Sequence, residues 1–388
     1  MGSVQARPMR SRTTAVLTVA GFAAGVAVAA FVSDGRHAEA QAPTAPPFVT
    51  HVTTTERLPA PPPPELRFSA VGDITLGRTP SLPEGGADAL FRFVTPRLTG
   101  DVVLGNLETT LATGGSAKCG PESTNCYSFR APPEYAAALR RAGFTILNLA
   151  NNHAYDFGAT GQAETLAALK RAGIRHTGRP GEIAFLRRGG VRIAVVGFAP
   201  YKWAQSLLDL EAARRLVRRA DARADLVIVT MHAGAEGSDR NHVRPGAESY
   251  LGEPRGDVVA FAHAVIGAGA DIVIGHGPHV LRGLEWYHGR LIAYSLGNFS
   301  SFRTFNVSGT LGVSAILQVT LRRDGGWVSG HIVPVRLVGA GTPTIDGRHA
   351  AWTLMRDLSR EDFGKRAVRI SPKGDLLPPT RARAPSRG

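Results

Sequence analysis

The sequence is poor in cysteine: its 388 residues include two, Cys119 and Cys126. So few thiols argue against a structural zinc site built from thiolates. Gly, Pro, Ser and Asn lie between the two cysteines and form a turn-rich segment that can close a disulfide. Two unpaired loop thiols and a two-ligand metal clip are the alternatives.

The chain also lacks a repeat period and any run that interleaves aromatic with basic residues, so we expect no nucleic-acid platform. Acidic residues are in deficit: 31 Asp and Glu stand against 45 Lys and Arg, which gives a formal net charge of +14. Such a balance is typical of proteins that meet nucleic acid, anionic lipid or an acidic polymer. We rank nucleic acid last among these partners.

Charge is absent from residues 15–32, which are apolar, small or hydroxylated. Arg7, Arg10 and Arg12 precede this run, and Ala38-Glu39-Ala40 follows it as a small-x-small cleavage site. The pattern predicts that residues 1–40 are a signal peptide or an uncleaved N-terminal membrane anchor. In both cases the body lies outside the cytoplasm, secreted or anchored to the cell membrane, and there a Cys119–Cys126 disulfide is favoured.

Composition divides the rest of the chain into a linker, a folded domain and a tail. Residues 41–65 are rich in Pro and Thr and predict an extended linker. Residues 66–370 alternate apolar strand-like and helix-like segments, which predicts one α/β domain of layered sheets and helices. Residues 371–388 are rich in Pro, Arg and Gly, and we expect a disordered basic tail.

Several apolar strand-like segments of this domain end in side chains that can bind a metal. These residues are Asp73, Glu108, Asn152 with His153, His232, and His276 with His279. One sheet edge can gather them, and their mixed oxygen and nitrogen donors suit Mn²⁺, Zn²⁺ or Fe²⁺. Taken singly, each has an ordinary explanation as a turn, a helix cap or a buried histidine. Together they favour a site for up to two divalent ions that acts on a phosphoryl-like group.

The order of these motifs resembles the CapA capsule-synthesis, or poly-γ-glutamate biosynthesis, family. The similar segments are Phe68 to Arg78 (FSAVGDITLGR), Gly105-Asn106-Leu107-Glu108, Asn151 to Gly158 (NNHAYDFG), His232 to Glu236 (HAGAE), Gly275 to Val280 (GHGPHV) and Tyr294 to Phe299 (YSLGNF). The family is similar in fold to calcineurin-like metallophosphoesterases. The resemblance therefore implies a four-layer α/β/β/α sandwich like that of metal-dependent phosphatases.

The resemblance also implies a role for each site residue. Asp73 corresponds to the first metal-binding aspartate, Glu108 to the bridging acid and Asn152 to a metal-binding amide. His153 corresponds to the catalytic acid/base, and His232, His276 and His279 to the late metal ligands. Asp156, Glu236 and Asn298 are expected to orient these ligands; helix caps or turns are the alternative.

The chain departs from the metallophosphoesterase pattern at several positions. Thr75 stands where a histidine usually follows the first aspartate, and the bridging acid is Glu108 instead of aspartate. Gly277 and Ala233 replace a second histidine and a tryptophan that many family members carry. These departures would leave one of the two metal positions incomplete or weak.

The favoured hypothesis is an exported, membrane-associated protein of capsule or poly-γ-glutamate-type polymer synthesis or export with a divalent-metal, hydrolase-like site. Its partners would be the anionic polymer, the membrane through the N-terminal segment, and membrane subunits of the polymer synthase. A non-catalytic accessory protein of the synthesis complex is the second hypothesis. A general extracytoplasmic metallophosphoesterase is the third, because fold by itself does not establish hydrolysis.

Overall fold

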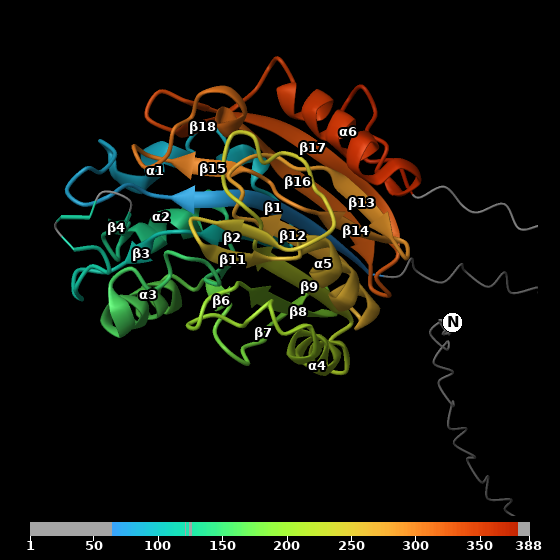
Figure 1. Cartoon of the computed structure of the whole chain (residues 1–388), viewed down its shortest axis with the longest axis horizontal. Coiled ribbons are helices and arrows are strands. Elements are labelled where there is room, and N and C mark those ends of the chain that lie inside the picture. Colours follow the sequence, from blue (N-terminus) through green and yellow to red (C-terminus); the bar gives the residue numbers. More distant parts are fainter. Residues whose placement is uncertain (1–63, 121, 124–125, 379–388) are drawn as a thin grey trace, which may run out of the picture. The chain divides into compact units, whose positions relative to one another are not determined.

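The computed structural model describes residues 64–120, 122–123 and 126–378 and has a mixed α/β fold with several sheets (Figure 1). The expected export signal (residues 1–40), nearly all of the linker and residues 379–388 lie outside the described residues. Among the described residues, no helix combines the length and the apolar character needed to cross a membrane.

The larger sheet has eight strands arranged around β1 (Glu65–Thr75). On one side β1 pairs in parallel with β2 (Val102–Leu107), and β5 (Ile146–Asn148) and β6 (Arg175–Thr177) follow. On the other side its first half pairs with β16 (Val313–Arg322) and its end with β15 (Asn298–Ser301). The strands β17 (Trp327–Val338) and β18 (Thr342–Ile345) complete the sheet beyond β16.

The second sheet has six strands in the order β13-β14-β12-β9-β8-β7. Its parallel strands β8, β9, β12 and β14 form its centre. The ranges are β7 (Ala184–Arg188), β8 (Val191–Phe198), β9 (Leu226–His232), β12 (Ile272–His276), β13 (Leu284–Tyr287) and β14 (Arg290–Ala293). Two small pairs stand apart: β3 (Thr110–Leu111) with β4 (Arg130–Ala131), and β10 (Glu248–Tyr250) with β11 (Glu253–Gly256).

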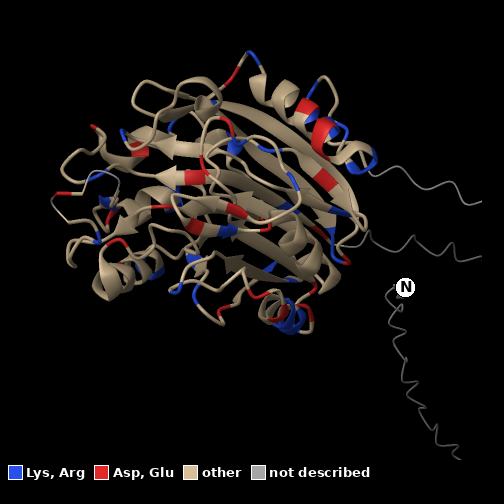
Figure 2. Cartoon of the chain, viewed as in Figure 1, with Lys and Arg blue, Asp and Glu red and all other residues tan. Residues whose placement is uncertain are grey.

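The helices cover these sheets through amphipathic faces. The helices α1 (Gly86–Phe91), α2 (Tyr135–Ala142) and α3 (Gly158–Arg171) share a core with the larger sheet. The helices α4 (Leu210–Asp221) and α5 (Val258–Gly267) share another with the second sheet, and α6 (Ala350–Phe363) contacts β13 and β17. The outer face of α4 carries a cluster of arginines (Figure 2).

Strand alternation explains why the sheets pack on both faces. In β8, Val191, Ile193 and Val195 belong to a core that both sheets share. The intervening Ala194, Val196 and Phe198 belong to the core with α4 and α5. Because successive strand side chains point to opposite faces, this near-continuous apolar run can serve both cores.

A cluster around Asp225 ties the two sheets together. Its carboxylate accepts hydrogen bonds from Arg192 of β8 at 3.0 Å and from Arg323, in the turn after β16, at 3.1 Å. Burial opposes ionisation of Asp225, but the hydrogen bonds from Arg192 and Arg323 outweigh it and lower its pKa below the ordinary value. The carboxylate is therefore ionised at neutral pH.

The folded part extends beyond residue 370, where we placed its end. Residues 371–378 pack on the domain. Asp375 forms an isolated β-bridge with His331, Leu376 forms one with Ile370, and Leu376 is 3% exposed. The adjacent Leu376 and Leu377 give this segment apolar surface to bury, which its Pro- and Arg-rich composition obscures.

Candidate metal centre

Strand register places polar side chains in one row across each sheet. In the larger sheet Asp73 lies opposite Asn298 on one side and Asn106 on the other, and Asn106 lies opposite Asn148. In the second sheet His232 of β9 lies opposite His276 of β12. Asp73, Asn106 and Asn148 lie near the carboxyl ends of parallel strands, as His232 and His276 do in the second sheet. The two rows meet where His232 Nδ1 lies 3.9 Å from Asp73 Oδ1.

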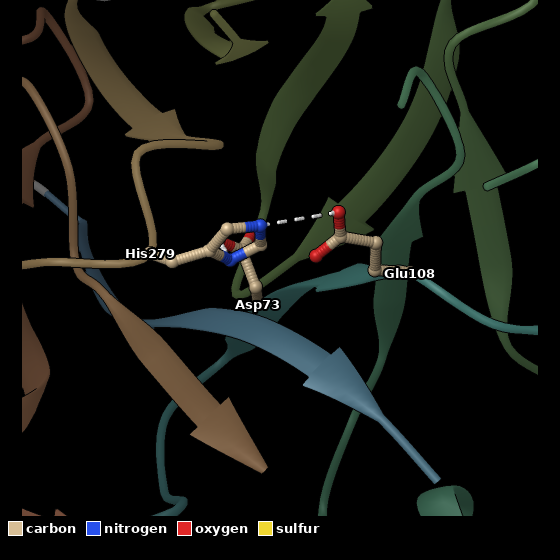
Figure 3. A group of neighbouring side chains, drawn as sticks. All are labelled: Asp73, Glu108 and His279. Carbon is tan, nitrogen blue, oxygen red and sulfur yellow. Dashed lines mark ion pairs between the residues drawn. The ribbon is translucent and has the colours of Figure 1, made fainter. Parts of the chain in front are cut away.

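Asp73, Glu108 and His279 form the centre of the site (Figure 3). Each is buried, and one possible ligand atom from each lies within 4.8 Å of the others. His279 Nδ1 is 3.2 Å from Asp73 Oδ2, and His279 Nε2 is 3.8 Å from Glu108 Oε1. His279 Nδ1 also lies 2.9 Å from Asn298 Oδ1, which assigns a ring hydrogen to Nδ1 and makes Nε2 the nitrogen that could ligate an ion.

The backbone of His279 has an unusual conformation. His279 has φ of 62°, in the left-handed region that side chains other than glycine seldom adopt. Nearby, the Gly277 N–H donates to Asp73 Oδ2 at 3.2 Å. Strain of this kind is often found at binding sites, because the surrounding fold must maintain it.

Buried donor atoms without partners make this cluster a candidate cation site. Among the described residues, both Glu108 oxygens, both His276 ring nitrogens, His279 Nε2 and Asn152 Oδ1 are buried without a hydrogen-bond partner. Leaving one such group unsatisfied costs about 1–3 kcal/mol, and more if the group is charged. Carboxylate and imidazole donors suit Mn²⁺, Zn²⁺ or Fe²⁺, so the residues present fit a divalent ion.

The charges of the cluster also fit a cation. Burial raises the pKa of Glu108 well above its ordinary value, and Asp73 and Glu236 act in the same direction. Burial opposes ionisation of Asp73, but His279 outweighs it and the pKa of Asp73 is lowered. Burial would lower the pKa of His279, yet Glu108 and the other nearby carboxylates raise it well above normal. The neighbouring carboxylates thus favour positive charge between them.

The other two predicted histidine ligands lie beside Asp73. His276 Nδ1 is 3.8 Å from Asp73 Oδ1, and burial lowers the pKa of His276 to about 4. His232 Nδ1 is 3.9 Å from Asp73 Oδ1, and its Nε2 is 3.7 Å from Glu108 Oε1. His276 is therefore neutral and available to ligate, whereas His232 has hydrogen-bonding neighbours.

His153 lies in a separate polar group. Its Nδ1 is 2.7 Å from Asp156 Oδ2, and Lys118 Nζ is 2.7 Å from Asp156 Oδ1. Burial lowers the pKa of His153, although Asp156 opposes this shift. Lys118 precedes Cys119, which is joined to Cys126 in a disulfide. The disulfide-closed segment thus begins next to the residue that pairs with Asp156.

A cavity of about 650 Å³ is lined by His153 and, among the candidate metal ligands, by Asn152 and His279. Its lining includes Asn152, His153, Glu236, Arg255 and His279, together with Lys118, Tyr127, Tyr201, Trp203 and Phe305. The rings of Tyr201 and Trp203 stack with centroids 5.2 Å apart. The cavity therefore combines ionisable groups with a flat aromatic wall.

The structure brings most of the predicted residues together but changes their relations. Glu236 lies 3.6 Å from His279 Nε2, and Asn298 contacts the same ring. Asn152 lines the cavity, and its Oδ1 has no hydrogen-bond partner among the described residues. Thr75, which stands where the metallophosphoesterase pattern has a histidine, hydrogen-bonds the Ser300 carbonyl at 3.1 Å.

Sequence reasoning missed Asn106 and Arg255. Asn106 Nδ2 donates to Asp73 Oδ1 at 2.8 Å, and Arg255 pairs with Glu236 at 2.7 Å. The position of Asn106 within the Gly105-Asn106-Leu107-Glu108 motif could have pointed to it. Arg255 lies outside every motif, and no sequence signal distinguishes it from a surface arginine.

Comparison with known proteins gives the family. The model of the bacterial capsule synthesis protein family PGA_cap matches residues 67–302. The capsule biosynthesis protein CapA of Bacillus anthracis is 32% identical over 324 residues, which cover 76% of this chain and 74% of that protein. The PGA biosynthesis protein CapA of Bacillus subtilis (strain 168) is 32% identical over 280 residues, 67% of this chain and 69% of that protein.

Likeness to solved structures is weaker. A 5'-nucleotidase precursor from Thermus thermophilus aligns with a TM-score of 0.40 and 15% identity, over 72% of this chain and 54% of that one. Likeness at this level does not establish a shared activity. The sequence matches do establish kinship: the chain belongs to the bacterial capsule synthesis protein family PGA_cap.

Proposed function

We propose that this chain is an exported, membrane-associated protein that acts in the synthesis or export of a capsule or poly-γ-glutamate-type anionic polymer. Its family membership and the names of its Bacillus relatives support the pathway. The charge-free run at residues 15–32, behind Arg7, Arg10 and Arg12, supports export with a retained or cleaved N-terminal segment.

The proposal includes a fold class and a reaction class. The three cores, one shared by both sheets and one with helices beside each sheet, support a four-layer α/β/β/α sandwich like that of metal-dependent phosphatases. The reaction class is metal-assisted hydrolysis. The observation that carries it is the group of buried, unpartnered donors around Glu108.

Each site residue has a role in this reaction. Asp73, Glu108, His276 and His279 would hold the ion, with Asn152 as a further oxygen donor. When bound, a divalent ion lowers the pKa of bound water and polarises a phosphoryl or carbonyl oxygen. His153, oriented by Asp156 and lining the cavity, exchanges a proton with the leaving group.

The basic surface supports an anionic polymer as partner. A groove at the edge of the second sheet is lined by Arg175, Arg187, Arg188, Arg192 and Arg223. The arginines of α4 add to this charge (Figure 2). Such surfaces attract polyanions and raise the rate of encounter.

Turnover assays test the hydrolytic part of this proposal. The full-length chain, supplied with Mn²⁺, is assayed on a chromogenic phosphodiester and on poly-γ-glutamate, beside Glu108→Gln and the control Glu285→Gln. Glu285 is also buried, but it pairs with His263 and Arg366 away from the site. We expect Glu108→Gln to reduce turnover by about a hundredfold and Glu285→Gln to retain it if folded. Absence of turnover of both substrates by the wild type would contradict hydrolysis.

An accessory role is the second candidate, and a cellular assay distinguishes it. The hydrogen bonding of His232 to Asn106 favours this candidate, because it engages an expected ligand, and Thr75 supplies no histidine at the position two residues after Asp73. Polymer production that survives His153→Ala but is lost on deletion of the domain would support an accessory role. Loss of production in both variants supports the catalytic proposal. Protease accessibility of the domain in intact cells tests export.

A further inference from the structure

We propose that this site binds one divalent ion and that the guanidinium of Arg255 occupies the second cation position. This inference rests on the proposed metal site and concerns its occupancy. A second ion would need donors other than those around Asp73 and His279. The histidine that could supply one is His232, whose Nε2 lies 3.7 Å from Glu108 Oε1.

Neighbouring side chains lie against both nitrogens of His232. Its Nδ1 lies 3.1 Å from Asn106 Nδ2. The amide orientation of Asn106 is fixed, because its Oδ1 accepts hydrogen bonds from Asn148 Nδ2 and Asn151 Nδ2. His232 Nδ1 therefore accepts from Asn106 and is not open to an ion. The guanidinium of Arg255 lies beside the other nitrogen, Nε2, so a second ion would have to displace it.

Arg255 lies on the same side of His232. Its side chain is 1% exposed, and its Nη2 is 3.4 Å from His232 Nε2. Hydrogen bonds to the Gly234 carbonyl at 2.9 Å, Tyr201 Oη at 2.9 Å and Glu236 Oε1 at 2.7 Å hold the guanidinium in place. Such pairing is what allows an arginine to be fully buried.

Gly277 provides the space that Arg255 fills. A Cβ built at this position would lie 3.0 Å from Arg255 Nη2, and Gly277 has φ of +109°. A larger side chain would displace the guanidinium and strain the backbone. The glycine and the arginine therefore fit each other.

The charges match one ion. Arg255 neutralises Glu236, with which it pairs at 2.7 Å. With His279 neutral as a ligand, the carboxylates of Asp73 and Glu108 remain, and a single divalent ion balances their two charges. A second divalent ion beside the guanidinium would add uncompensated positive charge in a buried site, which is strongly unfavourable.

This arrangement also gives Arg255 a part in binding. Arg255 lines the cavity together with Glu236 and His279. A guanidinium can donate to the oxygens of a phosphate or carboxylate, so Arg255 would hold an oxyanion of the substrate beside the ion.

Metal counting tests the inference on the full-length chain. The protein is stripped with a chelator and dialysed against Mn²⁺, and bound ions per chain are measured by elemental analysis. Electron paramagnetic resonance then distinguishes isolated from coupled Mn²⁺. We compare the wild type with Arg255→Met and Arg255→Lys. Arg282→Met is the control, since Arg282 is also fully buried but pairs with Glu248.

We expect one isolated Mn²⁺ per chain in the wild type, Arg255→Lys and Arg282→Met. Arg255→Met should bind Mn²⁺ about tenfold more tightly or better, because a nearby positive charge is removed. Two coupled ions in the wild type would overturn the inference and leave the proposed function standing. Weaker binding by Arg255→Met than by Arg282→Met would reduce Arg255 to a structural role. No bound ion in any protein would overturn the proposed function itself.

Discussion

Glu108→Gln should abolish stabilisation of the fold by metal. Glu108 is completely buried, and neither of its oxygens has a hydrogen-bond partner among the described residues. In the metal-free chain the substitution removes a group whose charged form is disfavoured by burial, so it should not lower stability. When Mn²⁺ is added, the variant should gain no stability, because it lacks the carboxylate at the centre of the site.

The magnitude follows from ligand linkage. An ion at a hundred times its dissociation constant stabilises the folded state by about 2.7 kcal/mol. For a domain of this size, each kcal/mol moves the Tm by about 2 °C. The wild type should therefore gain about 5 °C on addition of Mn²⁺ and lose it on addition of a chelator.

Thermal unfolding with and without Mn²⁺ measures this difference. Glu108→Gln should show a metal-free Tm equal to or above that of the wild type, and no rise with Mn²⁺. Glu285→Gln should show a lower Tm but the same rise, because Glu285 stabilises the fold through His263 and Arg366. A rise in Glu108→Gln equal to that of the wild type would refute the assignment of Glu108 to the site.

Three other substitutions test the surrounding fold. Gly72→Ala should lower the free energy of unfolding by at least about 3 kcal/mol, because the new Cβ would lie 1.8 Å from the Gly297 carbonyl oxygen. The control Gly267→Ala, whose Cβ would meet no atom, should be neutral or stabilising in the same urea titration. Asp225→Asn should lower the free energy of unfolding by only about 1 kcal/mol at pH 7, because the partner arginines are half exposed. Since the pKa of Asp225 is lowered in the folded state, this loss of stability should be present above the unfolded pKa near 4 and shrink below it. Equal losses at pH 7 and pH 3 would contradict the pairing. Cys119→Ser should cost about 2 kcal/mol and expose the loop to proteolysis without changing Mn²⁺ stoichiometry; unchanged protease resistance would argue against a disulfide that orders this loop.

Much of the candidate site could be predicted because its residues end buried strands. Asp73 and His276 each terminate or closely follow a strongly apolar run. Parallel strands bring such ends together. The Leu376 region was missed because a short apolar pair within a Pro-rich tail has no periodicity.

The roles of Asn106 and Arg255 could not be read in the same way. Asn106 is one of several amides near strand ends, and its importance comes from facing His232 in the other sheet. Arg255 lies on β11, a short strand of a hairpin outside both sheets. Local patterns carry no information about contacts between elements so far apart in the chain.

The sequence by itself determined which segments become buried strands, which chemistry their ends carry, and to which family the chain is related. These properties depend on side-chain type and on spacing along a short stretch of chain. The tertiary structure decided which donors meet, which hydrogen-bonding nitrogens remain free, and that a guanidinium lies beside Glu236 and His232. Those outcomes depend on strand order, on register between the sheets and on the packing of distant side chains, and they are fixed only when the whole domain is assembled.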